Sequence, residues 1–153
     1  MLLVALAASG CGGGSSTTAG PPTAAAPPAP AETVSLADIS EEKPGGPEQT
    51  VLRWWRYVQL NDPKAAQALY ATEPTLPNLA GQFNVVTSHL HGKVTVVSTK
   101  ERGNDATVTV SWRKDDGSKT SEIVELEELN GEWKISGAGF LDELAEEFPA
   151  EEG

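Results

Sequence analysis

The sequence predicts an α+β fold in which N-terminal helices pack on a curved antiparallel sheet. Two patterns predict it, and they follow one another along the chain without mixing. Residues 47–70 carry apolar side chains at helical spacing. Residues 94–135 instead alternate apolar and polar side chains, as half-buried strands do, and Asn130-Gly131 within them is a strong hairpin signal. Helices followed by consecutive hairpins are typical of the α+β class.

The first helix is predicted to begin at Pro47, because proline is tolerated in the first turn of a helix. Four apolar residues then stand at i, i+3, i+4 and i+7, so they share one face; they are Val51, Trp54, Trp55 and Val58. We expect this face to close one side of the sheet.

A break and a restart are predicted at Asn61-Asp62-Pro63. Asp62 suits the N-cap of a second helix better than a catalytic role, and Pro63 suits its first position. The apolar face of that helix is formed by Ala66, Leu69 and Tyr70. A short third helix is predicted over residues 77–83, with strand-like alternation from Val85 onward.

Four strands are predicted, over residues 93–100, 106–113, 120–129 and 132–136. The second of them alternates most clearly, with inward positions at Ala106, Val108, Val110 and Trp112. Turns are predicted at Gly103-Asn104, at residues 115–118 and at Asn130-Gly131.

The chain has a single cysteine, Cys11, which excludes an intrachain disulfide and a cysteine-built zinc site. Residues 2–8 before it are apolar, as in a signal peptide, but too few to span a bilayer. Ala8-Ser9-Gly10-Cys11 resembles the lipobox of bacterial lipoproteins, although that family usually has Leu at the Ala8 position. The resemblance implies removal of residues 1–10 and lipidation of Cys11, hence a lipid anchor on the extracytoplasmic face of the cell membrane. The alternative is a plain secretory signal with an incidental cysteine.

No Lys or Arg precedes this apolar run, so we expect the translation start to lie upstream of Met1. Residues 11–46 follow as a disordered tether rich in Gly, Ser, Thr, Pro and Ala. Within it, a short strand-like contact with the domain is expected at Val34, Leu36 and Ile39.

Acidic charge gathers at the C-terminus. The formal net charge of −11 divides into −3 for residues 1–46, −2 for residues 47–140 and −6 for residues 141–153. Basic residues are scattered, so the nucleic-acid binders, which need a basic stripe, are excluded. We expect residues 141–153 to form an acidic tail in which Leu141, Leu144 and Phe148 have helical spacing.

The segment TVLRWWRYVQLNDPKAAQALY, residues 50–70, resembles the start of an NTF2-like domain, and LNGEWKI, residues 129–135, resembles the closing hairpin of that superfamily. The resemblance covers residues 47–140 and extends to lipoprotein members found in actinobacteria. It implies a cone-shaped α+β barrel with a pocket between sheet and helices. Homodimers formed through the open sheet face are common in the superfamily, and a homodimer is left open here.

Aromatic residues are the candidates for lining that pocket, because ligand pockets are mostly apolar. The candidates are Trp54, Tyr57, Tyr70 and Trp112. Core packing is the alternative for each of them, since large rings bury large areas.

His89 and His91 are the only histidines. On an extended segment, residues at i and i+2 face the same side, where they could supply a general base. A surface or loop role is the competing interpretation. A metal site needs three or four converging ligands, and no third one is visible, so no metal and no cofactor are predicted.

The sequence therefore favours a lipid-anchored envelope protein with a non-catalytic NTF2-like domain that binds a small apolar ligand or an envelope partner. The alternative is an NTF2-like enzyme of isomerase or dehydratase type that uses a pocket histidine.

Overall fold

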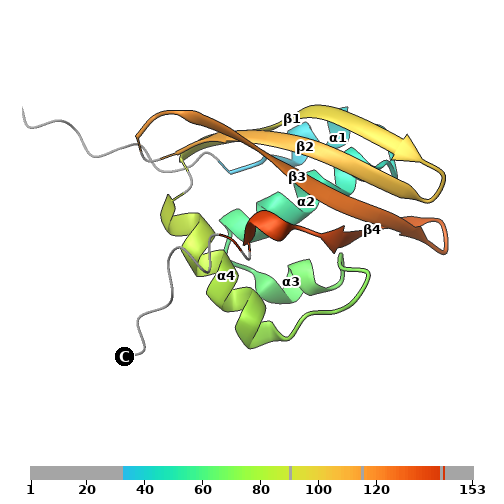
Figure 1. Ribbon diagram of the computed structural model, residues 1–153, viewed down its shortest axis with the longest axis horizontal. Helices are drawn as coiled ribbons and strands as arrows, with labels where there is room; N and C mark the ends of the chain where they lie inside the picture. The colour runs from blue at the N-terminus through green and yellow to red at the C-terminus, as the bar shows by residue number, and fades with distance from the viewer. Residues whose placement is uncertain (1–32, 90, 115, 142, 144–153) are drawn as a thin grey trace, which may run out of the picture.

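The computed structural model describes residues 33–89, 91–114, 116–141 and 143. Four helices precede a four-stranded antiparallel sheet, and α2, α3 and α4 lie along one of its faces (Figure 1). The predicted α+β class is therefore confirmed. The predicted signal peptide and Cys11, the predicted tether up to residue 32, and residues 142 and 144–153 of the predicted tail lie outside the described residues.

The sheet is a meander in the order β1-β2-β3-β4. Its strands are β1 (His91–Arg102), β2 (Asp105–Arg113), β3 (Lys119–Leu129) and β4 (Glu132–Gly137). Each of them contains the corresponding predicted strand and is slightly longer at one or both ends. Asn130 and Gly131 both have positive φ, at 55° and 81°, as a two-residue hairpin turn requires. The register of β1 against β2 shifts twice, between His91 and Thr95 and between Val96 and Ser98.

One face of the sheet is buried against the helices. The alternation predicted for β2 is complete, since Ala106, Val108, Val110 and Trp112 are all buried. Across the ladder, Val124, Leu126 and Ile135 are also buried, whereas Ile123 on the opposite face of β3 is 55% exposed. The core therefore lies between this face and the apolar stripe of α2.

Helix α2 (Pro47–Gln59) supplies the predicted stripe, in which Val51, Trp54, Trp55 and Val58 have no exposed surface. It ends before Asn61, whose φ of 51° breaks the helical path. Asp62 then caps α3 (Pro63–Gln67) by accepting from the backbone N of Ala65 at 3.0 Å, as predicted.

The segment after α3 closes one edge of the sheet. Tyr70 and Ile135 form a parallel bridge, in which Ile135 N donates to Leu69 O at 2.7 Å and Ala71 N donates to Ile135 O at 2.8 Å. The N–H and the C=O of Ile135, which face away from β3, are thus both hydrogen-bonded at this edge of β4.

Helix α4 (Leu76–His89) is longer than the helix predicted over residues 77–83. Strand-like alternation was predicted from Val85 because residues 85–88, VVTS, have side chains that favour strands. That prediction was wrong, since these residues belong to α4. Burial outweighs this preference, since Val86 joins Leu79 and Phe83 in the core. The hydroxyl of Thr87 donates to Phe83 O at 2.9 Å, which satisfies it within the helix.

The folded region begins before Pro47, within the segment predicted as tether. Val34 is fully buried, and α1 (Leu36–Glu41) follows it as a helix where a strand-like contact was expected. A capping box explains the helix, because Ser35 accepts from Asp38 N while Asp38 accepts from Ser35 N. No helix in the described part of the chain is long and apolar enough to cross a membrane.

Asp38 also joins α1 to the sheet, through an ion pair of 2.6 Å with Lys93 on β1. This hydrogen bond and those from Ser35 lower the pKa of Asp38 from 3.8 to about 2. The ionised carboxylate is therefore the form that the folded state prefers.

We expect Asp38→Asn to lower the free energy of unfolding at pH 7 by about 1 kcal/mol, because it weakens the cap and removes the ion pair. The folded pKa lies below the unfolded one, so the contribution of the carboxylate is complete above about pH 4 and is lost as the pH falls toward about 2. Urea unfolding of both proteins across this range should show the difference shrinking. A constant difference would contradict the assignment. Asp62→Asn is the matched control, because asparagine caps a helix as well as aspartate does.

Candidate functional site

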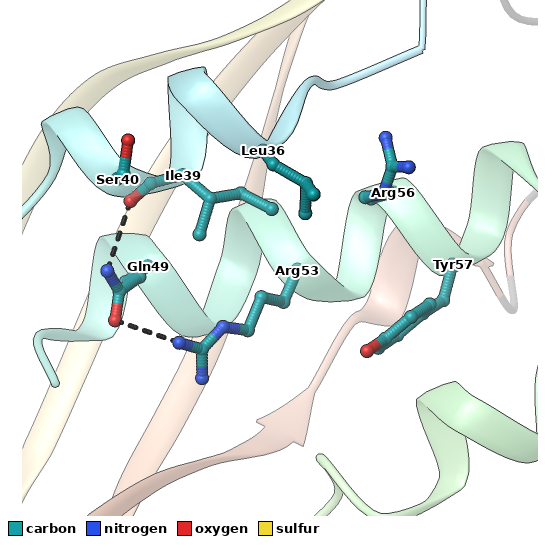
Figure 2. Close-up of a pocket in the computed structure, with 7 residues that line it drawn as sticks. All are labelled: Leu36, Ile39, Ser40, Gln49, Arg53, Arg56 and Tyr57. Carbon is teal, nitrogen blue, oxygen red and sulfur yellow. Dashed lines mark hydrogen bonds between the residues drawn. The ribbon is translucent and has the colours of Figure 1, made fainter. Parts of the chain in front are cut away.

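The structure separates the four aromatic residues predicted to line a pocket. Trp54 and Trp112 lie in the core, with 0% and 6% of their surfaces exposed, and Tyr70 is half-buried against them. Tyr57 lies elsewhere on α2, at a groove beside α1 (Figure 2). Three of the candidates therefore belong to one closed cluster, and the fourth belongs to an open surface.

The cluster, here called the aromatic cluster, comprises Trp54, Trp55, Tyr70, Trp112 and Phe140. Its centre is Trp55, which stacks on Phe140 with a ring-centroid distance of 5.6 Å and an interplanar angle of 14°. The ring centroids of Trp55 and Trp112 are 5.0 Å apart. Trp54 meets Trp55 edge to face at 5.2 Å. The rings from α2, β2 and the C-terminal turn thus fill the space between helix and sheet.

Phe140 was not among the predicted site residues. It lies in a helical turn after β4, is 5% exposed, and contacts the rings of Trp54, Trp55 and Trp112. A signal for it was present, because Phe140 and Leu141 form an apolar pair where the domain meets the acidic tail, and both are buried.

The two adjacent indoles differ in how their N–H groups are satisfied. Trp54 Nε1 donates to the hydroxyl oxygen of Tyr70 at 2.9 Å. Trp55 Nε1 is buried and has no hydrogen-bond partner within the described part of the chain. A buried donor without an acceptor costs about 1–3 kcal/mol. The cluster therefore contains one unused donor among apolar rings.

Glu122 lies on the inner face of β3, paired with Val110 across the ladder. Burial raises the pKa of Glu122, and the neighbouring carboxylate of Glu143 raises it further, while Lys114 opposes both. Two carboxylates thus repel each other where the chain leaves the C-terminal turn.

A groove of about 290 Å³ runs between α1 and α2 (Figure 2). Its lining comprises Leu36, Ile39, Ser40, Gln49, Arg53, Arg56 and Tyr57. Leu36 is 69% exposed, which leaves an apolar side chain beside two guanidinium groups.

Backbone and amide groups hold these arginines in place. Arg56 donates to Val34 O at 2.6 Å, and Arg53 donates to Gln49 Oε1 at 3.2 Å. Gln49 in turn donates to Ile39 O at 3.1 Å. Among the described residues, neither arginine pairs with a carboxylate. The groove therefore has the chemistry to bind a ligand that carries an anionic group next to an apolar one.

The two histidines do not share an extended segment, which corrects the predicted geometry. His89 is the last residue of α4, and His91 is the first residue of β1. Helix α4 continues to His89, because burial of Val86 outweighs the strand preference of residues 85–88. The argument that residues i and i+2 of one strand face the same side therefore does not apply to His89 and His91. The side chain of His91 lies outside the described residues. No group of three His, Cys, Asp or Glu that could hold a metal ion occurs in the described part of the chain.

No protein-family model and no curated protein matches the chain. Its structure is similar to that of a SEC-C motif containing protein from Rhodopseudomonas palustris, at 15% identity over 66% of this chain and 84% of the other, with a TM-score of 0.48. It is also similar to a function-unknown protein from Mycobacterium tuberculosis, at 13% identity over 58% of this chain and 64% of the other, with a TM-score of 0.42.

A third similar structure is a de novo designed protein with a curved β-sheet, at 16% identity over 73% of this chain and 98% of the other, with a TM-score of 0.45. None of these likenesses assigns the chain a family, a ligand or an activity. Membership of the NTF2-like superfamily stays a prediction.

Proposed function

We propose that the protein is an extracytoplasmic lipoprotein, held at the cell membrane by lipid on Cys11, whose NTF2-like domain binds a small apolar ligand at the aromatic cluster. The lipobox-like Ala8-Ser9-Gly10-Cys11 and the low-complexity residues that follow support the anchor. Two-chain lipid attachment is enough for stable anchoring.

The observation that carries the ligand-binding part is the unpaired Trp55 Nε1. Small-molecule sites are mostly apolar surfaces with a few placed polar groups, and this donor is one such group among aromatic rings. Purely structural packing gains nothing from leaving it unpaired. The enzymatic alternative has less support, because His89 lines neither the α1–α2 groove nor the aromatic cluster.

Binding of an envelope partner is the second candidate, and it is favoured by Arg53 and Arg56, which have no carboxylate partner among the described residues. An acidic protein segment with an apolar side chain would complement Arg53, Arg56 and Leu36. Replacing both arginines by glutamate should abolish photo-crosslinking from position 36 to such a partner. The control is the same charge reversal at Lys100 and Arg102, which line a separate hollow on the β1–β2 hairpin. Equal crosslinking in all three proteins would exclude this candidate.

Cys11→Ala should move the protein from the membrane fraction to the medium, because it removes the only cysteine that can carry the lipid. Fractionation with metabolic labelling by an alkyne fatty acid measures both effects. Ser15→Ala, in the spacer, is the matched control and should stay membrane-bound and labelled. The anchor proposal fails if the Cys11→Ala protein remains in the membrane fraction.

The mature wild-type protein should bind prodan, a naphthyl ketone, at a single saturable site, because its planar rings match the aromatic cluster and its carbonyl can accept from Trp55. Quenching of tryptophan fluorescence during the titration measures this binding. A quenching signal that rises linearly without saturation, in the wild type and in every variant described below, would refute binding at the cluster.

A further inference from the structure

The C-terminal turn, residues 138–141, is the element that covers the aromatic cluster. Phe140 contributes the ring that stacks on Trp55, and Leu141 is 3% exposed beside it. The other rings of the cluster come from α2, β2 and the residues that follow α3, so they are held by the helices and the sheet. Among the described rings of the cluster, Phe140 alone comes from the segment that follows the last strand.

This turn is attached to the fold by side-chain packing more than by backbone pairing. Leu141 N donates to Ala138 O at 2.9 Å, so this hydrogen bond closes the turn on itself. The β4 ladder ends at Gly137, before the turn begins. Gly139 is exposed, and no atom lies within 4 Å of the position that a Cβ would take there. Displacing the turn would therefore leave the sheet hydrogen bonds intact.

Charge weakens the attachment further. Glu143, just beyond the turn, repels Glu122 on the inner face of β3. Lys114 attracts Glu122 and does not remove this repulsion. The same carboxylates would disfavour an anionic ligand at this end of the cluster. A cation would lose its hydration among the apolar rings, so a ligand that replaces the turn would be neutral.

We propose that residues 138–141 are a displaceable lid, and that Phe140 occupies the place of a neutral, planar aromatic ligand with a hydrogen-bond acceptor that receives the Trp55 N–H. This inference rests on the proposed ligand-binding function and adds its regulation and ligand class. Phe140 stacks on Trp55 nearly in parallel, at 14°. Because an indole N–H lies in the plane of its own ring, a planar ligand in the place of Phe140 must instead tilt relative to Trp55, so that its acceptor reaches the edge of the indole ring.

The test compares prodan with pyrene, a planar aromatic that has no acceptor. Phe140→Ala should bind both probes at least about tenfold more tightly than the wild type, because the competing ring is gone. Phe83→Ala is the matched control, since Phe83 is also fully buried but makes none of the cluster's ring contacts. It should leave the affinities unchanged.

Trp55→Phe, added to Phe140→Ala, keeps an aromatic ring and removes the donor. It should weaken prodan binding about two- to tenfold and leave pyrene binding unchanged, as expected for one hydrogen bond. Equal loss for both probes would overturn the role of the N–H. Equal prodan affinity in wild type and Phe140→Ala would overturn the lid while leaving the proposed binding function standing.

A measurement on the wild type covers the case in which Phe140→Ala does not fold. The indole ¹H resonance of Trp55, assigned by its absence in Trp55→Phe, should move further downfield with saturating prodan than with saturating pyrene, because both probes change the ring current at Trp55 but only prodan accepts its N–H. The Trp133 indole, half-buried on β4, should not move with either probe. An unmoved Trp55 resonance at saturating prodan would overturn the proposal.

Discussion

The packing of the apolar stripe of α2 against the inner face of the sheet is the constraint on which the structure depends. Trp54 and Trp55 are adjacent in sequence, their rings contact each other, and both are fully buried. A buried aromatic ring removes roughly 150–250 Å² from water, which corresponds to about 4–6 kcal/mol of transfer free energy for each. Trp112 of β2 packs on Trp55, and Phe140 of the final turn contacts both rings.

The opposite side of the same helix has a different chemistry. Gln49, Arg53, Arg56 and Tyr57 face α1 instead of the sheet. One helix thus supplies both the centre of the core and one wall of the α1–α2 groove. Substitutions of Arg53 and Arg56 are expected to separate surface binding from stability, because these two side chains line the groove and are not part of the hydrophobic core.

The sequence was most informative where local chemistry and burial agree. The alternation of β2, the Asn130-Gly131 turn and the Asp62 cap each follow from a few neighbouring residues, and all three were predicted correctly. The end of α4 was not, because Val85, Val86 and Thr87 prefer strands locally and only contact with distant residues keeps them helical. Helix α1 was missed for a related reason, since six residues show too little periodicity to stand out from a tether.

The candidate site was less predictable than the fold. Sequence alone indicates that Trp54, Tyr57, Tyr70 and Trp112 are large and aromatic, but whether a ring fills a core or borders a cavity depends on what lies opposite. Here Phe140 lies opposite, from a part of the chain that local patterns assign to a domain boundary. Likewise, the missing partner of Trp55 Nε1 is a property of the assembled packing and has no counterpart in the residue order.

The two edges of the sheet would have different consequences if the proposed lipid anchor concentrates the protein on a membrane surface. Residues 69–71 cover β4 at Ile135, so pairing by a second chain is blocked there. At the other edge, β1 is twice out of register with β2, and such irregularities twist an edge away from flat pairing. If copies are held by lipid in one leaflet, their encounters are frequent and similarly oriented. An irregular β1 would then protect neighbouring copies from edge-to-edge aggregation.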